Sequence, residues 1–397
     1  MIKALFKVFF YIPAIPIATL IRIISPVIII RTGPLMSGRI GHFAMNTELD
    51  QCKKIFFINT PKKYFLDLYY IARPSCNKQL EIMWRRKLSI VPIELLGPID
   101  QISRKYFYSP KFDAVYKTSV VDNYNLLDKT KPILEFTDQE ISKGNLILKS
   151  MGIPIDAKYV CLIIRDSKYL EKLNPDIDWS YHDYRDTSIE NYYLAAEELA
   201  RLGYYVLRMG SEVKKAFNLN NKQIIDYANS IYRSDFMDVF LCAHCTFSIS
   251  SGTGLESVPE IFRRPTLFVN YAPIGYVQTF SKNYLFTTKK IYDNFSKKYL
   301  SLSEIKKRGA HLFQRTEDYT DNNLSLIENS PDEILNATLE MLPIAAGIYK
   351  PLSPLQEKYW SAFPINAVDT DGQRLHGEIR ANISLSFIRN NQFFIAD

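Results

Sequence analysis

The clearest pattern of hydrophobic and polar positions lies in the second half of the chain, where apolar runs of strand length alternate with helical segments. The run YVCLIIRD begins at Tyr159, and Ser188 is suited to cap a helix that continues to Leu202 and stops at Gly203. Further strands are predicted for YYVLRM, TFSIS and PTLFVN, with helical segments between them. This alternation persists to Asn270 and predicts a parallel sheet covered by helices.

The first half shows a weaker form of the same rhythm. From Val27, VIIIR predicts a strand, TGPLMSGRIGH a glycine-containing loop and FAMNTELDQCKK a helix. KKIFFIN then predicts a second strand and KKYFLDLYYIA a second helix, with further alternation up to about Tyr108. We therefore predict an α/β protein of two facing Rossmann-like domains.

A chain of 397 residues is longer than one hydrophobic core usually organises, which favours two domains. A helix over FTDQEISKGNLILKSMGIP, capped by Thr137 and closed by Gly152, marks the predicted junction. After Lys289 the alternation gives way to helices and to a tail whose structure the pattern leaves open. The predicted segments are an apolar N-terminal segment at 1–26, a first Rossmann-like domain at 27–148, a second at 149–340 and a helical tail at 341–397.

The N-terminal segment is strongly apolar and begins with Lys3 and Lys7, but Pro13, Pro16 and Arg22 interrupt it. A membrane-spanning helix needs about 20 predominantly apolar residues, and no A-x-A cleavage site for a signal peptide follows. Two interpretations stay open with equal weight. The segment either contacts a membrane surface from one side or packs as a hydrophobic helix on its own domain.

Composition and net charge limit the classes of binding partner that this protein can have. Hydrophobic residues make up 47% and charged residues 23% of the chain, which excludes a largely disordered protein. The net charge of +7 favours anionic partners such as nucleotide diphosphates or lipid phosphates. Because the basic residues are spread along the chain, we expect no nucleic-acid partner. Aromatic residues, at 13%, suit stacking on sugars or bases but more often fill cores.

Cys242 and Cys245 form a CxxC pair, CAHC, which has the spacing of a redox motif or of half a zinc site. Apart from them the chain contains Cys52, Cys76 and Cys161, and no second pair completes a zinc site. The motif lies in the apolar run FLCAHCTFSIS, where free cysteines act as small hydrophobic residues. We favour that structural interpretation.

The sharpest chemical signal is the sequence Ser250, Ser251, Gly252, Thr253 and Gly254 between a predicted buried strand and a helix. Small residues let backbone amides approach a phosphate, and a helix N-terminus adds partial positive charge. Glu256, or Glu260, is placed to accept hydrogen bonds from ribose hydroxyls. The structural alternative is a glycine needed only for a tight turn.

Arg165 strengthens this prediction because it ends the first strand of the same domain, and carboxyl ends of parallel strands face the ligand crevice. A guanidinium there can bind a diphosphate leaving group in bidentate fashion. Arg208 lies near the end of the next predicted strand and Gly210 directly after it, and both are predicted to bind the donor as well. The alternative for Arg165 is an ion pair with Asp166, Asp183 or Asp186, and Arg208 carries the same ambiguity.

In the first domain, the loop Ser37 to His42 has glycines that permit close backbone approach and an imidazole at the predicted helix start. His42 is the candidate base that deprotonates an acceptor hydroxyl, with Glu48 and Asp50 as alternative carboxylates. The alternative is a histidine that only makes hydrogen bonds at a helix terminus. Asp176 and Asp178 have the D-x-D spacing of a Mg²⁺ site, but they follow LNP in a polar loop, so we expect no metal.

Three stretches, SGRIGHFAMNTEL, YRDTSIENYYLAAEELARLGYYVLRMG and SDFMDVFLCAHCTFSISSGTGLESVPEIF, resemble a group of bacterial glycosyltransferases known mainly from genome sequences. That group is distantly similar to GT-B enzymes such as the fucosyltransferases. The resemblance extends over most of the chain from Val27. Ile163 stands where fucosyltransferases often have the histidine of a His-x-Arg pattern, so GDP-fucose is not implied as the donor.

The resemblance implies a metal-independent transferase without a cofactor, whose second domain binds the nucleotide sugar and whose first domain meets the acceptor. It gives Arg165 the diphosphate-binding role, and it places the acceptor at a loop that contains Gly38, Arg39, Gly41 and Asn46. The basic, apolar N-terminus suits a protein peripheral to the cytoplasmic face of a bacterial membrane, with glycan or lipid-linked acceptors of surface polysaccharide or lipopolysaccharide synthesis. The rival hypotheses are a nucleotide-sugar epimerase of the same architecture and a non-catalytic scaffold that binds glycans or nucleotides.

Overall fold

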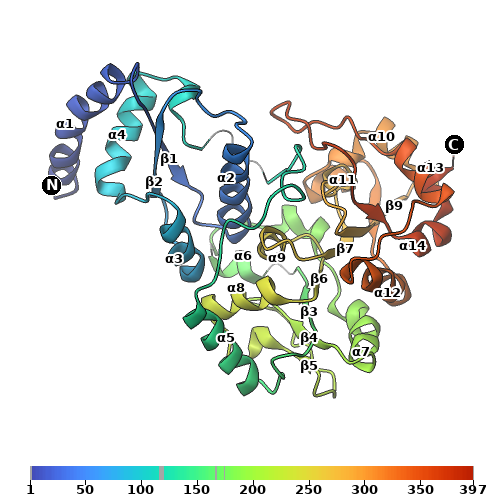
Figure 1. Cartoon of the computed structure of the whole chain (residues 1–397). Helices are drawn as coiled ribbons and strands as arrows, with labels where there is room; N and C mark the ends of the chain where they lie inside the picture. The colour runs from blue at the N-terminus through green and yellow to red at the C-terminus, as the bar shows by residue number, and fades with distance from the viewer. Residues whose placement is uncertain (1, 116–119, 166–167, 174, 397) are drawn as a thin grey trace. The chain divides into compact units, whose positions relative to one another are not determined.

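The computed structural model describes residues 2–115, 120–165, 168–173 and 175–396. Contacts between residues divide the chain into two compact units. Unit 1 comprises Met1–Val120 and Thr130–Phe136, and unit 2 comprises Val121–Lys129 and Thr137–Asp397. The α/β class with parallel sheets is confirmed in the described elements, many of which Figure 1 labels.

Unit 1 is built on two parallel strands that pair in register from Ile29↔Phe65 to Leu35↔Ile71. Single parallel bridges extend this sheet on both sides, from Thr32 to Asp113 and from Tyr69 to Ile90. The described helices and strands of the unit are α1 (Ile2–Ile23), β1 (Ile29–Leu35), α2 (Thr47–Ile55), β2 (Phe65–Ile71), α3 (Lys78–Lys87) and α4 (Ile93–Tyr106).

The second strand of unit 1 lies later in the sequence than predicted. KKIFFIN completes helix α2 and the turn after it, whereas FLDLYYI, predicted as helix, forms β2. A contact between the strands accounts for the difference. Arg31 of β1 lies opposite Asp67 of β2, and the pair forms an ion pair of 2.6 Å in which both side chains are buried. Such pairing over long sequence separation overrides local propensity.

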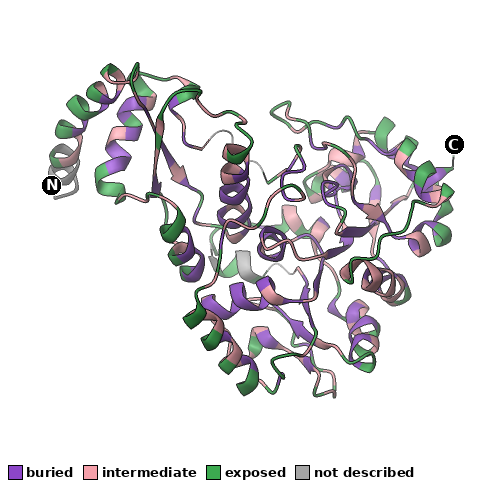
Figure 2. Cartoon of the chain, in the orientation of Figure 1, coloured by how far each residue is buried: buried purple, intermediate pink, exposed green. Residues whose placement is uncertain are grey.

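Helix α1 turns one side toward α4 and leaves the other side open (Figure 2). Ala14 and Ala18 are buried against Ile102 of α4, and the Tyr11 hydroxyl donates to Gln101 at 2.5 Å. This agrees with the interpretation of a helix that packs on its own domain, although large apolar side chains such as Phe9 stay exposed.

None of the helices in the described part of the chain combines the length and the apolar character that a membrane crossing requires.

Unit 2 contains a seven-stranded parallel sheet in the order β12-β8-β7-β6-β3-β4-β5. The strands are β3 (Tyr159–Ile163), β4 (Tyr205–Arg208), β5 (Ile224–Ile225), β6 (Phe247–Ser250), β7 (Thr266–Tyr271), β8 (Tyr284–Thr288) and β12 (Asn382–Ile383). The helices up to β8 are α5 (Asp138–Ser150), α6 (Lys168–Leu173), α7 (Tyr193–Arg201), α8 (Asp235–His244) and α9 (Ser257–Ile261). The predicted strands and helices of 159–270 are confirmed in type and order.

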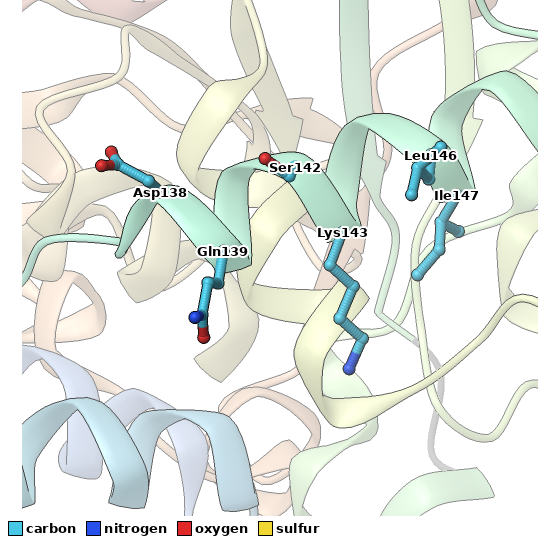
Figure 3. A pocket seen from close by; sticks show the side chains of 6 residues that line it. All are labelled: Asp138, Gln139, Ser142, Lys143, Leu146 and Ile147. Carbon is cyan, nitrogen blue, oxygen red and sulfur yellow. The ribbon is translucent and has the colours of Figure 1, made fainter.

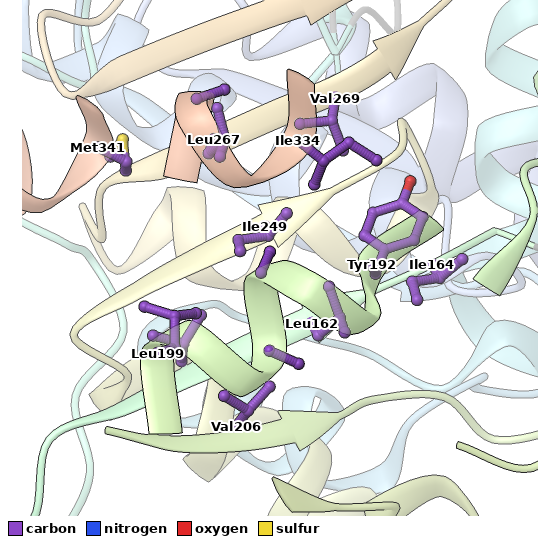
Figure 4. Packing of buried hydrophobic residues seen from close by; sticks show 14 of the residues in the cluster. Leu162, Ile164, Tyr192, Leu199, Val206, Ile249, Leu267, Val269, Ile334 and Met341 are labelled. Carbon is purple, nitrogen blue, oxygen red and sulfur yellow. The ribbon is translucent and has the colours of Figure 1, made fainter. Parts of the chain in front are cut away.

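Both faces of this sheet are buried, which explains why a central strand such as β3 is a continuous apolar run. On one face, Val160 and Leu162 of β3 pack with α7 and with α12 (Pro331–Ala345), as Figure 4 shows for Leu199 and Ile334. On the other face, the Tyr159 hydroxyl donates to the Leu241 carbonyl of α8 at 3.2 Å. The alternation of side chains along a strand divides β3 between these two layers.

The thiols of Cys161, Cys242 and Cys245 are free and buried, on the side of β3 that faces α8. Burial raises the pKa of Cys161 well above its usual value, and the neighbouring thiols of Cys242 and Cys245 raise it further. The Cys245 thiol donates to the Cys242 carbonyl at 3.2 Å. These positions agree with the interpretation of the CAHC segment as part of the hydrophobic core.

The C-terminal part of unit 2 contains elements that the pattern did not predict. A three-stranded antiparallel sheet follows β8, in the order β10-β9-β11. Its strands are β9 (Lys290–Asp293), β10 (Lys298–Tyr299) and β11 (Leu324–Ile327), with α10 (Leu302–Lys307) and α11 (Thr316–Thr320) between them. After α12 the chain forms α13 (Pro354–Ala362), β12 and α14 (Leu385–Asn390), so the predicted helical tail also contributes the edge strand β12.

Contacts divide the chain differently from the predicted segments. The predicted boundary after residue 148 falls inside α5, which belongs to unit 2, and the boundary after 340 falls inside α12. Residues 1–26 belong to unit 1, and residues 341–397 to unit 2. A hydrophobic pattern marks elements well, but boundaries depend on which elements share a core.

Candidate functional site

The carboxyl edge of the large sheet in unit 2 is the first candidate site. From β3 the chain moves to β4 and β5 on one side and then returns to β6 on the other side of β3. The strand order therefore reverses between β3 and β6, and open parallel sheets bind ligands at such a switch point. Arg165 follows β3 there, and the loop from Ser251 to Gly254 follows β6.

Side chains of the loop after β6 bind its own backbone. The Ser250 hydroxyl accepts from the Gly252 amide at 3.2 Å and donates to Glu256. Glu256 also accepts from the Thr253 amide at 2.8 Å, and the Thr253 hydroxyl accepts from the Leu255 amide at 3.2 Å. These amides therefore have partners within the loop, and a bound phosphate would have to rely on other donors as well.

Burial raises the pKa of Glu256 to about 7, although the hydrogen bond from Ser250 acts in the opposite direction. The carboxyl group is buried and holds the loop together. Gly252 has a left-handed backbone conformation, with φ of +81°, that favours glycine, and Tyr271 packs beside it. The structure thus gives the glycine and the glutamate a structural role, and their predicted binding of a donor stays a prediction.

Arg165 lies at the centre of this edge. Its amide donates to the Ser251 hydroxyl at 2.8 Å, which joins the end of β3 to the loop after β6. Its Nε atom lies 3.2 Å from a carboxylate oxygen of Asp186, so the ion pair with Asp186 is confirmed. Burial, followed by the nearby charge of Arg185, lowers the pKa of Arg165 to about 10. Burial also raises the pKa of Asp186 to about 6, against the opposing effect of Arg165.

Two further cations at this edge were not predicted. Arg185, in the short 3-10 helix Ser180–Arg185, donates to the Gly252 carbonyl. Lys289, directly after β8, is buried and donates to the Asp186 carbonyl at 2.5 Å. The position of Lys289 at a strand end could have been recognised by the rule that drew attention to Arg165. Arg185 could not, because it lies inside a polar loop.

A network of polar side chains holds the segment that carries Arg185 and Asp186. Glu328 accepts from the Thr187 hydroxyl at 2.8 Å and from the Ser188 amide at 2.9 Å. Asn270, at the end of β7, donates to the Thr187 hydroxyl at 2.9 Å. Together with the bond from Lys289, these contacts fasten residues 186–188 to the ends of β7 and β8 and to Glu328.

Arg208 is the last residue of β4, the strand next to β3, and Gly210 lies two residues beyond it. The Arg208 side chain is almost fully buried and forms an ion pair with Asp226 at 3.3 Å. Asp226 also accepts from the Phe217 amide at 2.9 Å. The structure therefore gives Arg208 an ion-pair partner, and its donor-binding role stays a prediction, as does that of Gly210.

In unit 1 the predicted acceptor residues follow the carboxyl end of β1. The Ser37 hydroxyl donates to the Arg73 carbonyl at 2.7 Å, just beyond β2, which fixes the start of the loop. Within the loop Arg39 is exposed, Gly38 is half-buried and Gly41 is buried. Gly38, Arg39 and Gly41 therefore lie together at the carboxyl edge of this small sheet.

His42 and Asn46 are the first and last residues of a single turn of π-helix that leads into α2. Such turns occur frequently at functional sites. Burial lowers the pKa of His42, while the nearby Asn46 side chain favours the protonated ring. Among the residues that the structure describes, none makes a hydrogen bond of normal geometry with the buried Nδ1 atom of His42. A neutral imidazole with an available nitrogen can accept a proton.

No protein-family model and no curated protein matches the chain. Three solved structures are similar to it in fold. The glycosyl transferase family 9 protein of Veillonella parvula DSM 2008 is 11% identical, with a TM-score of 0.47, over 79% of this chain and 97% of that chain. The Escherichia coli ADP-heptose LPS heptosyltransferase II is 15% identical, with a TM-score of 0.34, over 62% and 86% of the two chains.

The third structure is the iron-containing dodecameric glycosyltransferase TibC of enterotoxigenic E. coli H10407. It is 11% identical, with a TM-score of 0.31, over 64% of this chain and 59% of that chain. None of the three is named as a fucosyltransferase, so the resemblance to that family stays a prediction.

The alternative carboxylates of unit 1 are buried in different ways. Glu48 accepts from the Ile133 amide at 3.1 Å and is fully buried, which is typical of a structural carboxylate. Burial raises the pKa of Asp50 to about 7, against the effect of Lys53. Asp50 therefore keeps the acid-base character of an alternative to His42.

Asp176 and Asp178 are exposed, and Asp178 accepts from the Ser180 amide at 2.9 Å, as expected of a solvated loop. Across the residues that the structure describes, no group of three or more His, Cys, Asp and Glu side chains is arranged to hold a metal.

A shallow hollow of about 630 Å³ lies along α5 (Figure 3). All its lining residues belong to that helix, namely Asp138, Gln139, Ser142, Lys143, Leu146 and Ile147. None of them comes from the carboxyl edge of the sheet. The hollow therefore lacks the converging polar groups of several elements that a nucleotide site needs.

Proposed function

We propose that this protein is a glycosyltransferase that moves a sugar from a nucleotide-sugar donor to a glycan or lipid-linked acceptor. The observation that carries the proposal is the group of cations Arg165, Arg185 and Lys289 at the carboxyl edge of the parallel sheet in unit 2, with Arg165 at the switch point of that sheet. A nucleoside diphosphate carries negative charge in a compact form, and guanidinium groups bind it in bidentate fashion. The resemblance of the sequence to bacterial GT-B transferases supports the same assignment.

In the proposed reaction, an acceptor hydroxyl oxygen forms a bond to the anomeric carbon of the donor sugar. The bond between that carbon and the diphosphate oxygen breaks, and the diphosphate leaves with the electron pair. Arg165 and Arg185 stabilise the developing charge, and the diphosphate replaces Asp186 as the partner of the Arg165 guanidinium. His42 accepts the proton of the acceptor hydroxyl.

The chain's own cations supply the charge that a metal ion provides in other transferases, so we propose a metal-independent reaction without a cofactor. The partners are the nucleotide sugar, the acceptor and the inner face of a bacterial membrane, where surface polysaccharides and lipopolysaccharides begin their synthesis. Nucleic acid is not among the proposed partners. Gly38, Arg39, Gly41 and Asn46 contact the acceptor, and the loop from Ser250 to Glu256, with Arg208 and Gly210, frames the donor.

The first experiment identifies the donor. Thermal unfolding is followed with UDP, GDP, ADP, CMP and their common sugars, because a ligand that binds the native state raises the apparent Tm. One nucleotide should raise the Tm of the wild type, and Arg165→Ala and Arg185→Ala should abolish that rise. Arg201→Ala is the matched control, because Arg201 is an exposed arginine of the same unit that pairs with Glu198 on its own helix. A nucleotide response that survives both site variants would contradict the proposed donor site.

The second experiment separates the rival functions. With the donor known, sugar transfer to acceptors is measured with and without EDTA. The proposed function predicts transfer that EDTA leaves intact and that His42→Gln abolishes while donor binding persists. A product formed from the donor alone, without acceptor, would indicate the epimerase. Binding without turnover, unchanged by Arg165→Ala, would indicate the scaffold.

A further inference from the structure

Three segments of unit 1 meet at the amino edge of its sheet. Residues 24–28 lead into β1, residues 56–64 lead into β2, and residues 107–112 lead to Asp113, which bridges to β1. The Ile29 amide donates to the Tyr64 carbonyl at 2.9 Å, and the Lys63 ammonium group donates to the Pro26 carbonyl at 3.3 Å. The Arg22 guanidinium lies over the Phe112 ring at 3.4 Å. The three segments are therefore neighbours.

These segments expose an unusual number of large side chains. Tyr64 is 86% exposed, Phe57 81% and Val27 77%. Phe56, Tyr106, Phe107 and Tyr108 are exposed beside them in sequence. Water around so many apolar groups is unfavourable, and a contiguous apolar patch of this kind marks an interaction surface.

The exposed side of α1 continues this surface from Ile23 toward the start of the helix. Ala14, Ala18 and Ile21 are buried, whereas the exposed residues between them are all apolar, namely Phe9, Ile12, Pro13, Ile15, Pro16, Ile17, Leu20 and Ile23. From residue 8 to residue 21 the sequence contains no charged residue. An apolar face that points away from the core of its own domain needs another partner.

Charge identifies that partner. The edge segments carry three exposed lysines, Lys62, Lys63 and Lys111, and a fourth, Lys105, lies at the end of α4 just before the third segment. Residues 24–28, 56–64 and 104–112 contain no aspartate or glutamate. Aromatic rings and lysines around an apolar face are the chemistry of a protein that lies in the interface of an anionic bilayer. A second copy would bring the same lysines and would be repelled.

We infer that the amino edge of the unit 1 sheet and the exposed side of α1 form a docking face for an anionic lipid bilayer. Phe57, Tyr64 and Tyr108 insert their rings at the level of the headgroups, and the lysines contact lipid phosphates. This inference rests on the proposed function in one respect, since the proposed function already places the protein at a membrane. The face itself is independent of the identity of donor and acceptor, and it is distinct from the carboxyl edge, where His42 lies.

The test is co-sedimentation of the full chain with vesicles, without any nucleotide. Vesicles of phosphatidylcholine alone are compared with vesicles that also contain phosphatidylglycerol. The wild type should bind the anionic vesicles, and added salt should weaken the binding. The double variant Phe57→Ser/Tyr64→Ser should bind at least about tenfold more weakly. Each of Lys62→Glu and Lys105→Glu should cost about fivefold or more, because a lysine near an anionic surface contributes at that level.

Two matched variants control for general effects. Phe295→Ser removes an equally exposed ring from unit 2, and Lys307→Glu reverses an exposed charge there. Both should bind vesicles like the wild type. Thermal unfolding with the donor nucleotide shows whether each variant is folded, and it tests the donor site separately from the membrane.

Absence of vesicle binding by the wild type, or equal binding by the Phe57→Ser/Tyr64→Ser variant, would overturn the inference while leaving the donor site untouched. A concentration-dependent dimer that disappears in the same variant would assign the face to a second copy instead. Failure of the proposed function looks different, because vesicle binding would persist while no nucleotide raised the Tm.

Discussion

Asn270 and Asn329 exchange hydrogen bonds, since the backbone amide of each donates to the side-chain oxygen of the other, at 2.8 Å and 2.5 Å. The exchange holds Asn270 in a left-handed conformation, with φ of +57°, at a register shift in β7. The Asn270 amide group then points at Thr187, two residues after Arg185. A pair of asparagines thus links the end of a core strand to the segment that carries the cation.

Asn270→Ala should therefore destabilise the protein and weaken nucleotide binding. The variant leaves the Asn329 amide without its acceptor in a buried place and strains the backbone, since alanine disfavours a positive φ. Asn323→Ala is the matched control, because Asn323 has the same φ of +57° but is exposed. We expect Asn270→Ala to cost about 2 kcal/mol more than Asn323→Ala in the free energy of unfolding.

Denaturant unfolding gives both free energies, and calorimetry gives the Kd for the donor. The Kd should rise in Asn270→Ala and stay unchanged in Asn323→Ala, because Asn270 donates a hydrogen bond to Thr187 beside Arg185 and Asp186. Equal losses of stability in the two variants would show that backbone strain explains the whole effect and that the network contributes nothing.

Gly252→Ala should damage the donor site through the backbone. A methyl group at Gly252 would meet Tyr271 at an ordinary distance of 3.5 Å, so the cost arises from φ of +81°. Gly347 has φ of +78° and open space around it, which makes Gly347→Ala the control. Both variants should lose about 1 kcal/mol of stability. Only Gly252→Ala should weaken nucleotide binding, and an unchanged Kd would show that the loop after β6 does not contact the donor.

Donor binding should tighten as the pH falls from about 7.5 to about 5.5, because Asp186 has a pKa raised to about 6 and competes with the diphosphate for Arg165. Protonation of Asp186 releases the guanidinium, and the gain should be on the order of tenfold. The phosphates of a nucleotide sugar are diesters and keep their charge over this range.

The raised pKa of Asp186 also affects folding stability, and the pH dependence of its contribution has the opposite sign to that of a carboxylate whose pKa is lowered by an ion pair. The folded state binds this proton more tightly, so the contribution of Asp186 to stability falls as the pH rises from about 4 to about 6.

Asp186→Asn should bind the donor tightly at both pH values, while Asp321→Asn, at an exposed aspartate, should keep the wild-type profile. Asp183, Lys214 and Lys289 also act on Asp186, and Glu256 titrates near pH 7 close to the same arginines. The comparison of the Asp186→Asn profile with the wild-type profile therefore carries the test. A pH dependence that survives in Asp186→Asn would assign it to Glu256 or another group.

Local signals were sufficient for much of unit 2. Thr137 caps α5 in a capping box with Glu140, and Gly152 and Gly203 end their helices with positive φ, as the sequence predicted. The strands β3, β6 and β7 are buried almost throughout, and the largely apolar run of β3 is readily recognised. Arg165 was found because a strand end is a local feature of the sequence.

Long-range contacts account for the rest. β2 was predicted as a helix because nothing local shows that Asp67 pairs with Arg31 of the neighbouring strand. The two-residue strand β12 forms only by pairing with β8, about a hundred residues earlier in the chain. Arg185 belongs to the site because its side chain reaches Gly252, a contact between two loops that no periodicity reports.

The packing of α5 on α8 offers a test of the fold that is independent of function. Gly144 of α5 faces the ring of Phe240, and a Cβ atom at Gly144 would lie 2.2 Å from that ring. Both residues are buried and neither lies at the carboxyl edge. Gly144→Ala should therefore force α5 away from α8 and cost about 1 to 3 kcal/mol, although alanine is the better helix former. Denaturant unfolding of Gly144→Ala, Phe240→Leu and the double variant measures the coupling. The smaller leucine should rescue part of the loss, whereas an additive double variant, or a Gly144→Ala variant more stable than the wild type, would show that the two helices do not pack closely at this point.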